Sequence, residues 1–179
     1  DSMTKPIDNS FWVIPDILLA GEHPGVAGPD EATRRIRRFL VSGIGQFIDL
    51  SERKECPVYE EALRREAEML GVDVQYSHHP IRDRGIPRSP VQMAALFREI
   101  SDAISRGQTT YIHANRGVGR TGVAIGCYLV ECGLDGDRAI RKLAILYSSM
   151  EKSAWEPQIP ETDQQIEYIR DWKAGAGQP

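Results

Sequence analysis

The stretch that decides the fold is residues 113–122, which read His-Ala-Asn-Arg-Gly-Val-Gly-Arg-Thr-Gly. The residues before it, 109–112, are β-branched or aromatic and predict a strand. Residues 121–132 are apolar nearly all round, which predicts a helix buried on every side. Backbone N–H groups converge where a glycine-containing loop leads from a strand into a helix, and the helix dipole adds partial positive charge there. We therefore expect residues 113–122 to bind an anion.

Three residues of this stretch suit a phosphate group in particular. Gly117 and Gly119 permit backbone angles and a close approach that a Cβ would obstruct. Arg120 offers a two-pronged guanidinium to two phosphate oxygens. The alternative is a strand-to-helix turn without a ligand, but that leaves an arginine at the start of a buried helix unexplained. We therefore interpret the stretch as a phosphate-binding loop.

The same stretch resembles the signature loop of the cysteine-dependent protein tyrosine phosphatases, His-Cys-x-x-Gly-x-x-Arg-Ser/Thr-Gly. It departs from that pattern at Ala114, where the family carries its nucleophilic cysteine. Alanine cannot attack phosphorus, so the chain as written is expected to bind a phosphate group without cleaving it. Three hypotheses follow: an active phosphatase whose cysteine was replaced by an engineer, a natural pseudophosphatase that binds phosphorylated partners, and an adaptor domain with no phosphate site.

Four further segments are similar to small dual-specificity-type phosphatases and follow the family's order: residues 12–25, 47–50, 79–87 and 160–165. The resemblance covers about residues 11–172. It implies an α/β fold with a central, largely parallel sheet flanked by helices. It also implies hydrolysis of phosphomonoesters, in proteins or small molecules, through a cysteinyl-phosphate intermediate and without a cofactor.

The resemblance also assigns roles to residues. Asp83 is expected to be the general acid, and Arg120 to hold the phosphate. Thr121 is expected to donate a hydrogen bond to the sulfur of the leaving thiolate, and Ala114 marks the position of the nucleophile. Around these, the residues expected to orient the loop and bind the substrate are His113, Asn115, Arg116, Gly117, Val118, Gly119 and Gln165.

For several of these residues an ordinary structural role is the alternative. Asp83 stands between two arginines and could form an ion pair with either. Thr121 could serve as a helix N-cap. Gln165 either positions the hydrolytic water or only lies on the amphipathic last helix. Arg116 either faces solvent or adds a cation that favours multiply charged substrates such as phosphoinositides or inositol phosphates.

Composition narrows the class of protein. The 179 residues have a net charge of −4, which argues against nucleic acid as a partner. No apolar run approaches a membrane span, and no cluster of metal ligands is evident. The three cysteines, Cys56, Cys127 and Cys132, suggest a reducing, cytoplasmic location. We expect a monomer.

Periodicity predicts one domain over residues 11–173. Strands are expected at 12–14, 17–20, 46–50, 72–76 and 109–112, and helices at 29–40, 57–70, 89–106, 121–132, 135–147 and 162–172. Asp1-Ser2 before Met3 indicates the remnant of an expression tag, which favours the engineered origin of Ala114. Residues 1–10 are then tag remnant and N-terminal arm, and 174–179 a flexible tail. The basic run 34–38 is either a solvated helix face or a docking patch.

Overall fold

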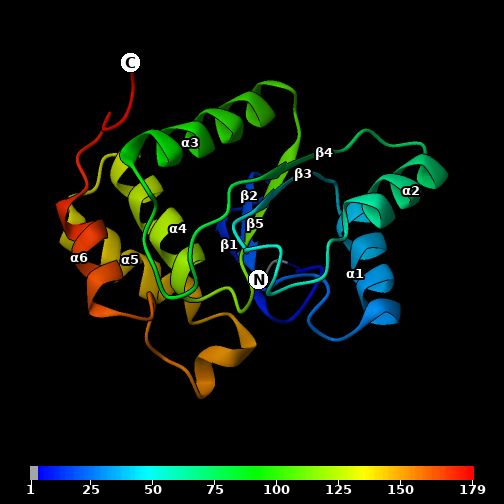
Figure 1. The fold of residues 1–179 in the computed structure, drawn as a ribbon, viewed down its shortest axis with the longest axis horizontal. Helices are drawn as coiled ribbons and strands as arrows, with labels where there is room; N and C mark the ends of the chain where they lie inside the picture. The colour runs from blue at the N-terminus through cyan, green and yellow to red at the C-terminus, as the bar shows by residue number, and fades with distance from the viewer. Residues whose placement is uncertain (1–3) are drawn as a thin grey trace.

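A five-stranded sheet with the order β1-β2-β5-β3-β4 lies at the centre of the computed structural model, which describes residues 4–179 (Figure 1). Strand β1 is antiparallel to β2, and all other neighbours are parallel. This mostly parallel sheet confirms the predicted fold class. The strands are β1 (Ser10–Ile14), β2 (Leu18–Gly21), β3 (Ile44–Asp49), β4 (Gln75–His78) and β5 (Thr109–His113).

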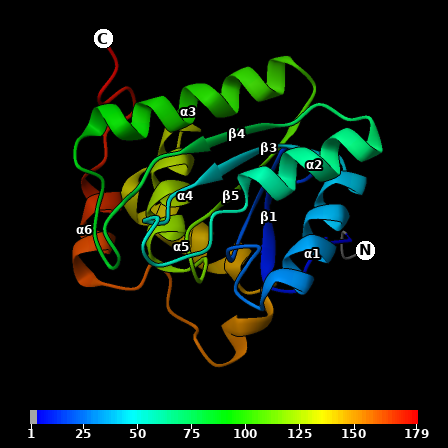
Figure 2. The same cartoon turned by 45° about the vertical axis from the view of Figure 1, so that its right-hand side comes forward.

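Helices cover both faces of the sheet, with α1 and α2 on one side and α3 to α6 on the other (Figure 2). A short 3₁₀ helix, η1 (Glu151–Ala154), interrupts the connection between α5 and α6. The helices are α1 (Pro29–Val41), α2 (Glu60–Leu70), α3 (Pro90–Ser105), α4 (Gly119–Glu131), α5 (Gly136–Tyr147) and α6 (Asp163–Asp171).

Strands β3 and β5 are buried on both faces of the sheet. Because successive side chains point to opposite sides of a strand, each of them contributes to both cores. Phe47 and Tyr111 are register partners and pack with Phe39 of α1. Their neighbours Ile48 and Ile112 are also register partners and belong to the opposite core, with α3 to α6. The two strands end together at the carboxyl edge of the sheet. In open α/β sheets this edge carries the ligand site.

Several predicted boundaries were wrong, and three of them bear on packing or on the site. Strand β4 begins at Gln75 and not at residue 72. Helix α2 begins at Glu60, because Tyr59 is its N-cap and its buried side chain points into the molecule. Helix α4 begins at Gly119, so that Thr121 lies inside the first turn and is not the N-cap, which is Val118.

Both ends of the described chain contact the domain. Ile7 is buried in the core beside α1, and the Lys5 ammonium donates to the carbonyl of Ser149 at 2.6 Å. The predicted tag remnant at residues 1–3 lies outside the described residues. In the tail, the Gly175 amide donates to the Glu131 carboxylate at 3.0 Å, and Ala176 packs on the core. The flexibility of residues 174–179 stays a prediction.

The basic run on α1 is paired with acidic residues. Arg35 lies 2.9 Å from Glu22, Arg37 lies 2.8 Å from Glu66, and the other two guanidiniums, of Arg34 and Arg38, approach Glu31. This pairing favours an ordinary solvated helix face over a docking patch. Among residues 4–179, no helix combines the length and the apolar character needed to cross a membrane.

Candidate active site

The loop between β5 and α4 lines a pocket of about 180 Å³ at the carboxyl edge of the sheet. Backbone hydrogen bonds hold it in place: Leu50 N donates to His113 O, and His23 N donates to Asn115 O, both at 2.8 Å. The structure brings Asp83 to the same pocket from the loop after β4. The lining residues are Asp83, Arg84, Ala114, Asn115, Arg116, Gly117, Gly119, Arg120 and Glu161.

Gly117 is a position in this loop where a side chain does not fit. Its φ is +80°, in the left-handed region, and a Cβ built there would lie 2.4 Å from the carbonyl carbon of Gly21. Gly119 is less crowded, since its Cβ would meet Gln165 at 3.1 Å. The tight packing of Gly117 on the end of β2 therefore shapes the loop.

Arg120 is 4% exposed and links the signature loop, residues 113–122, to the loop at residues 79–87, here called the acid loop. Its Nη1 donates to the Ile81 carbonyl at 2.9 Å, and its Nη2 approaches Asp83 at 3.3 Å. Both nitrogens donate to the Glu55 carboxylate, with Nη2 at 3.1 Å from Oε2. Burial opposes ionisation of Glu55, but the hydrogen bonds from Arg120 and from the Glu52 amide, together with the charge of Arg120, leave the pKa of Glu55 below its usual value.

Asp83 lies on a tight turn at the pocket rim, and its side chain is 65% exposed. Gly85 N donates to Arg82 O at 2.8 Å, and Arg84 has a φ of +61°. The alternative pairing of Asp83 with a neighbouring arginine is not found, because Arg84 instead lies 3.3 Å from Glu161. Asp83 is thus exposed at the mouth, within reach of a leaving group and of Arg120.

Thr121 and Ala114 are both buried at the base of the loop. Within residues 4–179, the Thr121 hydroxyl has no hydrogen-bond partner although it is shielded from solvent. Buried hydroxyls nearly always have a partner, because an unmade hydrogen bond is costly. The resemblance implies that the Thr121 hydroxyl donates to the sulfur of a cysteine at position 114. Ala114 has no sulfur, so this hydroxyl lacks that acceptor.

His113 is fully buried at the end of β5, where the loop begins. Its Nδ1 lies 2.9 Å from Ala114 O, where it can only donate, so in the neutral ring Nε2 accepts from the Tyr59 hydroxyl at 2.6 Å. Burial lowers the pKa of His113, although Asp49 opposes the shift. The ring is therefore neutral at pH 7, as expected of a residue that positions the loop and transfers no proton.

His23, Asp49 and His113 form a buried cluster whose potential metal-ligating atoms lie within 4.8 Å of one another. Hydrogen bonds already use most of these atoms: Asp49 accepts from Ser51 and Tyr76, and His23 Nδ1 accepts from Gly25 N. Burial, together with the neighbouring His113, lowers the pKa of His23 to about 3. We therefore interpret the cluster as polar support beneath the loop.

Gln165 is fully buried, and its amide bonds to three backbone groups. The side-chain oxygen accepts from Glu161 N and Thr162 N at 3.0 Å, and Nε2 donates to Gly85 O at 3.0 Å. It thus caps α6 and ties the acid loop to the domain, which neither predicted alternative included. Positioning of a water by Gln165 stays a prediction.

Arg116 is paired with two carboxylates. Its guanidinium donates to Glu156 and, at 3.2 Å, to Glu161. Four charged residues around the loop were not predicted: Glu55, Lys152, Glu156 and Glu161. The first three come from the irregular segments 51–59 and 148–159, where no periodic pattern or motif marks them. Glu161 lies within the family-like segment 160–165, but no role was predicted for it.

Comparison with known proteins places this site in a family. Residues 8–177 match the family model described as Swiss Army Knife protein, DSP-PTPase phosphatase domain. Protein 067L of Invertebrate iridescent virus 3, which carries the provisional name of a tyrosine phosphatase, is 22% identical over 90% of this chain. The chain spans 63% of that viral relative's length.

Solved structures show the same fold. Tk-PTP in its active form superposes with a TM-score of 0.71 at 19% identity, covering 92% of this chain and 96% of that one. The C132S form of TpbA from P. aeruginosa, solved with phosphotyrosine, has a TM-score of 0.60 at 13% identity and covers 94% and 92% of the two chains. With the family model matching nearly the whole length, the chain belongs to the DSP-PTPase phosphatase domains of the Swiss Army Knife type.

Proposed function

We propose that this chain is the inactive form of a phosphomonoester hydrolase of the tyrosine or dual-specificity type, in which Ala114 occupies the place of the nucleophilic cysteine. The buried, unpartnered hydroxyl of Thr121 among the described residues is the observation that carries the proposal. A cysteine thiolate at position 114 would supply the acceptor that this hydroxyl lacks. The retained Arg120 and Asp83 support an active parent over a natural pseudophosphatase, which has no need of an acid.

With cysteine at 114, the site's own groups account for both chemical steps. The loop amides, the N-terminus of α4 and Arg120 lower the thiol pKa, so that a thiolate forms at neutral pH. The sulfur attacks phosphorus, the S–P bond forms as the P–O bond breaks, and Asp83 gives its proton to the leaving oxygen. Water then attacks phosphorus and Asp83 takes its proton back. The departing thiolate accepts from Thr121.

The charges at the pocket mouth favour substrates with one phosphate group. Arg116 and Arg84 are the cations that could bind a second phosphate, but both are paired with Glu161, and Arg116 also with Glu156. A polyphosphorylated substrate must displace these carboxylates before it gains the arginines. We therefore propose a phosphorylated protein side chain or a singly phosphorylated small molecule as the substrate.

Restoring the nucleophile tests the proposed function. We expect Ala114→Cys to hydrolyse an aryl phosphate, with inhibition by vanadate and by thiol alkylation, because every other group of the mechanism is present. Ala114→Ser is the matched control, since it adds one polar atom at the same place without a thiolate. A folded Ala114→Cys protein that cleaves neither aryl phosphates nor phosphopeptides would refute the enzyme assignment.

Two further expectations belong to the same proposal. Buried free thiols at Cys56 and Cys127 suit a reducing cytoplasm, where we place the protein. We also propose that it works as a monomer, which light scattering on the purified protein measures directly. The residue encoded at position 114 in the native gene separates an engineered variant from a natural pseudophosphatase.

A further inference from the structure

We propose that Lys152 is a positioning residue that aims the Gly117 amide at the phosphate, an inference that rests on the proposed function. Lys152 belongs to η1 and is 7% exposed. Its ammonium donates to the carbonyl of Arg116 at 2.7 Å and to the carboxylate of Glu22 at 3.1 Å. Lysine is rarely buried to this degree unless it is paired. Here one of its two partners is the backbone of the signature loop.

Because a peptide bond is planar, the contact between Lys152 and the Arg116 carbonyl also fixes the direction of the Gly117 N–H. The group between Arg116 and Gly117 is planar and trans, so its C=O and its N–H point in opposite directions. Lys152 holds the C=O from behind the loop, and it does not line the pocket. Gly117 lines the pocket together with Ala114 and Asn115, so we infer that its N–H, on the side away from Lys152, points into the pocket. This N–H becomes a donor for a phosphate oxygen.

Lys152 is itself held from several sides. Glu22 is 6% exposed and also accepts from Arg35 at 2.9 Å, so the carboxylate is fixed between two cations. The Lys152 amide donates to Asn9 Oδ1 at 3.0 Å. Such a network restricts the ammonium to one place, which a positioning role requires.

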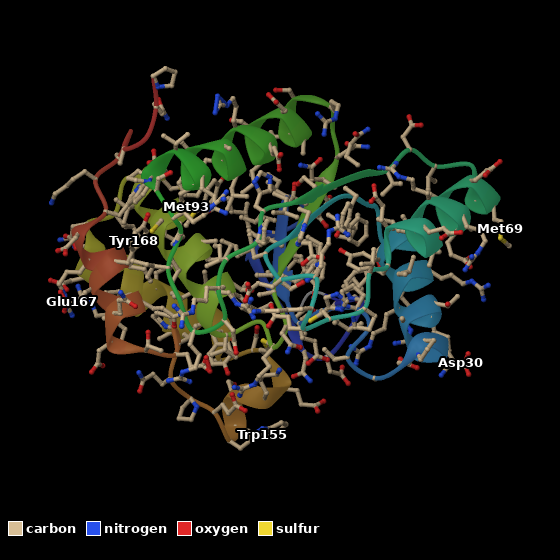
Figure 3. The ribbon with its side chains drawn as sticks, in the orientation of Figure 1. Asp30, Met69, Met93, Trp155, Glu167 and Tyr168 are labelled. Atoms are coloured by element: carbon tan, nitrogen blue, oxygen red, sulfur yellow. The ribbon has the colours of Figure 1, made fainter. Side chains whose placement is uncertain are left out.

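The position of η1 indicates that Lys152 orients the loop without contacting the substrate. Trp155, directly after η1, is 62% exposed and lies at the outer edge of the molecule (Figure 3). Lys152 on the same short segment is turned inward to Glu22 and Arg116. The side chain of Arg116 reaches Glu156 on the rim while its carbonyl is held at the back. Lys152 thus acts on the anion only through the backbone.

The test measures the Gly117 amide directly. In the Ala114 protein, adding sulfate should move the Gly117 amide resonance in ¹H–¹⁵N spectra, because its N–H donates to the anion. In Lys152→Met the shift should be lost, and sulfate should bind about tenfold more weakly, the loss expected for one hydrogen bond to a charged group. Lys142→Met, which removes an exposed lysine of α5, should behave like the parent.

A second variant separates the carbonyl contact from the ion pair. Glu22→Gln removes the charge of the partner and leaves Lys152 able to donate to Arg116 O, so the Gly117 shift should persist even if stability falls. Loss of the shift in Glu22→Gln, or its persistence in a folded Lys152→Met, would overturn the proposal. Activity of Ala114→Cys is the separate check on the proposed function: an active enzyme with an unaffected Gly117 in Lys152→Met refutes only the positioning role.

Discussion

Asp83 differs from the other carboxylates at the pocket in the exposure of its side chain, although it too approaches Arg120, at 3.3 Å. Its side chain is 65% exposed, whereas Glu55 and Glu161 are 16% and 22% exposed and are bound to arginines. Asp49, the other carboxylate at this edge of the sheet, accepts hydrogen bonds from Ser51 and Tyr76. A proton donor must reach the substrate, and Asp83 alone among these four combines exposure with a place in the pocket lining.

We therefore expect Asp83→Asn, in the Ala114→Cys background, to slow cleavage of substrates with poor leaving groups by about 10²–10⁴-fold. A nitrophenolate departs with little help from a proton and should be affected less. Asp73→Asn is the matched control, because Asp73 precedes β4 at the opposite edge of the sheet. Single-turnover rates with phenol and phosphate measured separately decide the matter, and equal leaving-group dependence in the two variants would exclude Asp83.

At the scale of elements, the junction between β2 and the signature loop is a tightly constrained contact. Gly117 has a φ of +80° and lies against the backbone of Gly21. Gly71, the C-cap of α2, has a φ of +70° but has open space around its Cβ position. Alanine substitutions at Gly71 and Gly117 therefore separate two costs in the free energy of unfolding. Both place a side chain on a left-handed backbone, but only the one at Gly117 also creates a clash, with Gly21.

Gly71→Ala should lower the free energy of unfolding by about 1 kcal/mol and leave sulfate binding unchanged. Gly117→Ala should lower it further, by about 2–3 kcal/mol, and abolish sulfate binding, because β2 and the loop must separate. Urea unfolding and calorimetric titration measure both. Sulfate binding by Gly117→Ala at the parent's affinity would contradict the structural role of this junction.

The elements also show what the sequence can predict. The β-branched and aromatic residues at 109–112 and the motif at 113–122 are local patterns, and they located β5 and the loop that follows it. Leu70 has the helical spacing of the buried Leu63 and Ala67, which predicts burial, yet it is 46% exposed at the last residue of α2. Glu55 and Lys152 act through contacts with residues 65 and 36 positions away, which no local pattern records.

At the scale of the whole molecule, two buried neutral histidines link stability to pH. Burial lowers the pKa of His113, and it lowers that of His23 to about 3. Below pH 6.5 the unfolded chain takes up protons that the folded chain refuses, so stability is present above pH 6.5 and is lost as the pH falls. Both residues lie beneath the signature loop, where they contact each other.

Acidification from pH 6.5 to 5.0 should therefore reduce the free energy of unfolding by about 1.5 kcal/mol through His23, with a further loss through His113. His23→Gln should remove the contribution of His23 from the slope of stability against pH. Urea titrations at the two pH values give the result. A parent protein equally stable at both would mean that these histidines are charged in the folded state.

The pairing of Arg120 with Glu55 makes anion binding a proton-linked exchange. Arg120 depresses the pKa of Glu55, and an anion that takes the guanidinium leaves burial to raise that pKa. Each sulfate bound near pH 4.5 should then be accompanied by uptake of a fraction of a proton. Calorimetry in buffers of different ionisation enthalpy counts that fraction, and Glu55→Gln should reduce it to zero. The protein would thus bind its ligand more tightly in mild acid, until the loss of folded stability overtakes the gain.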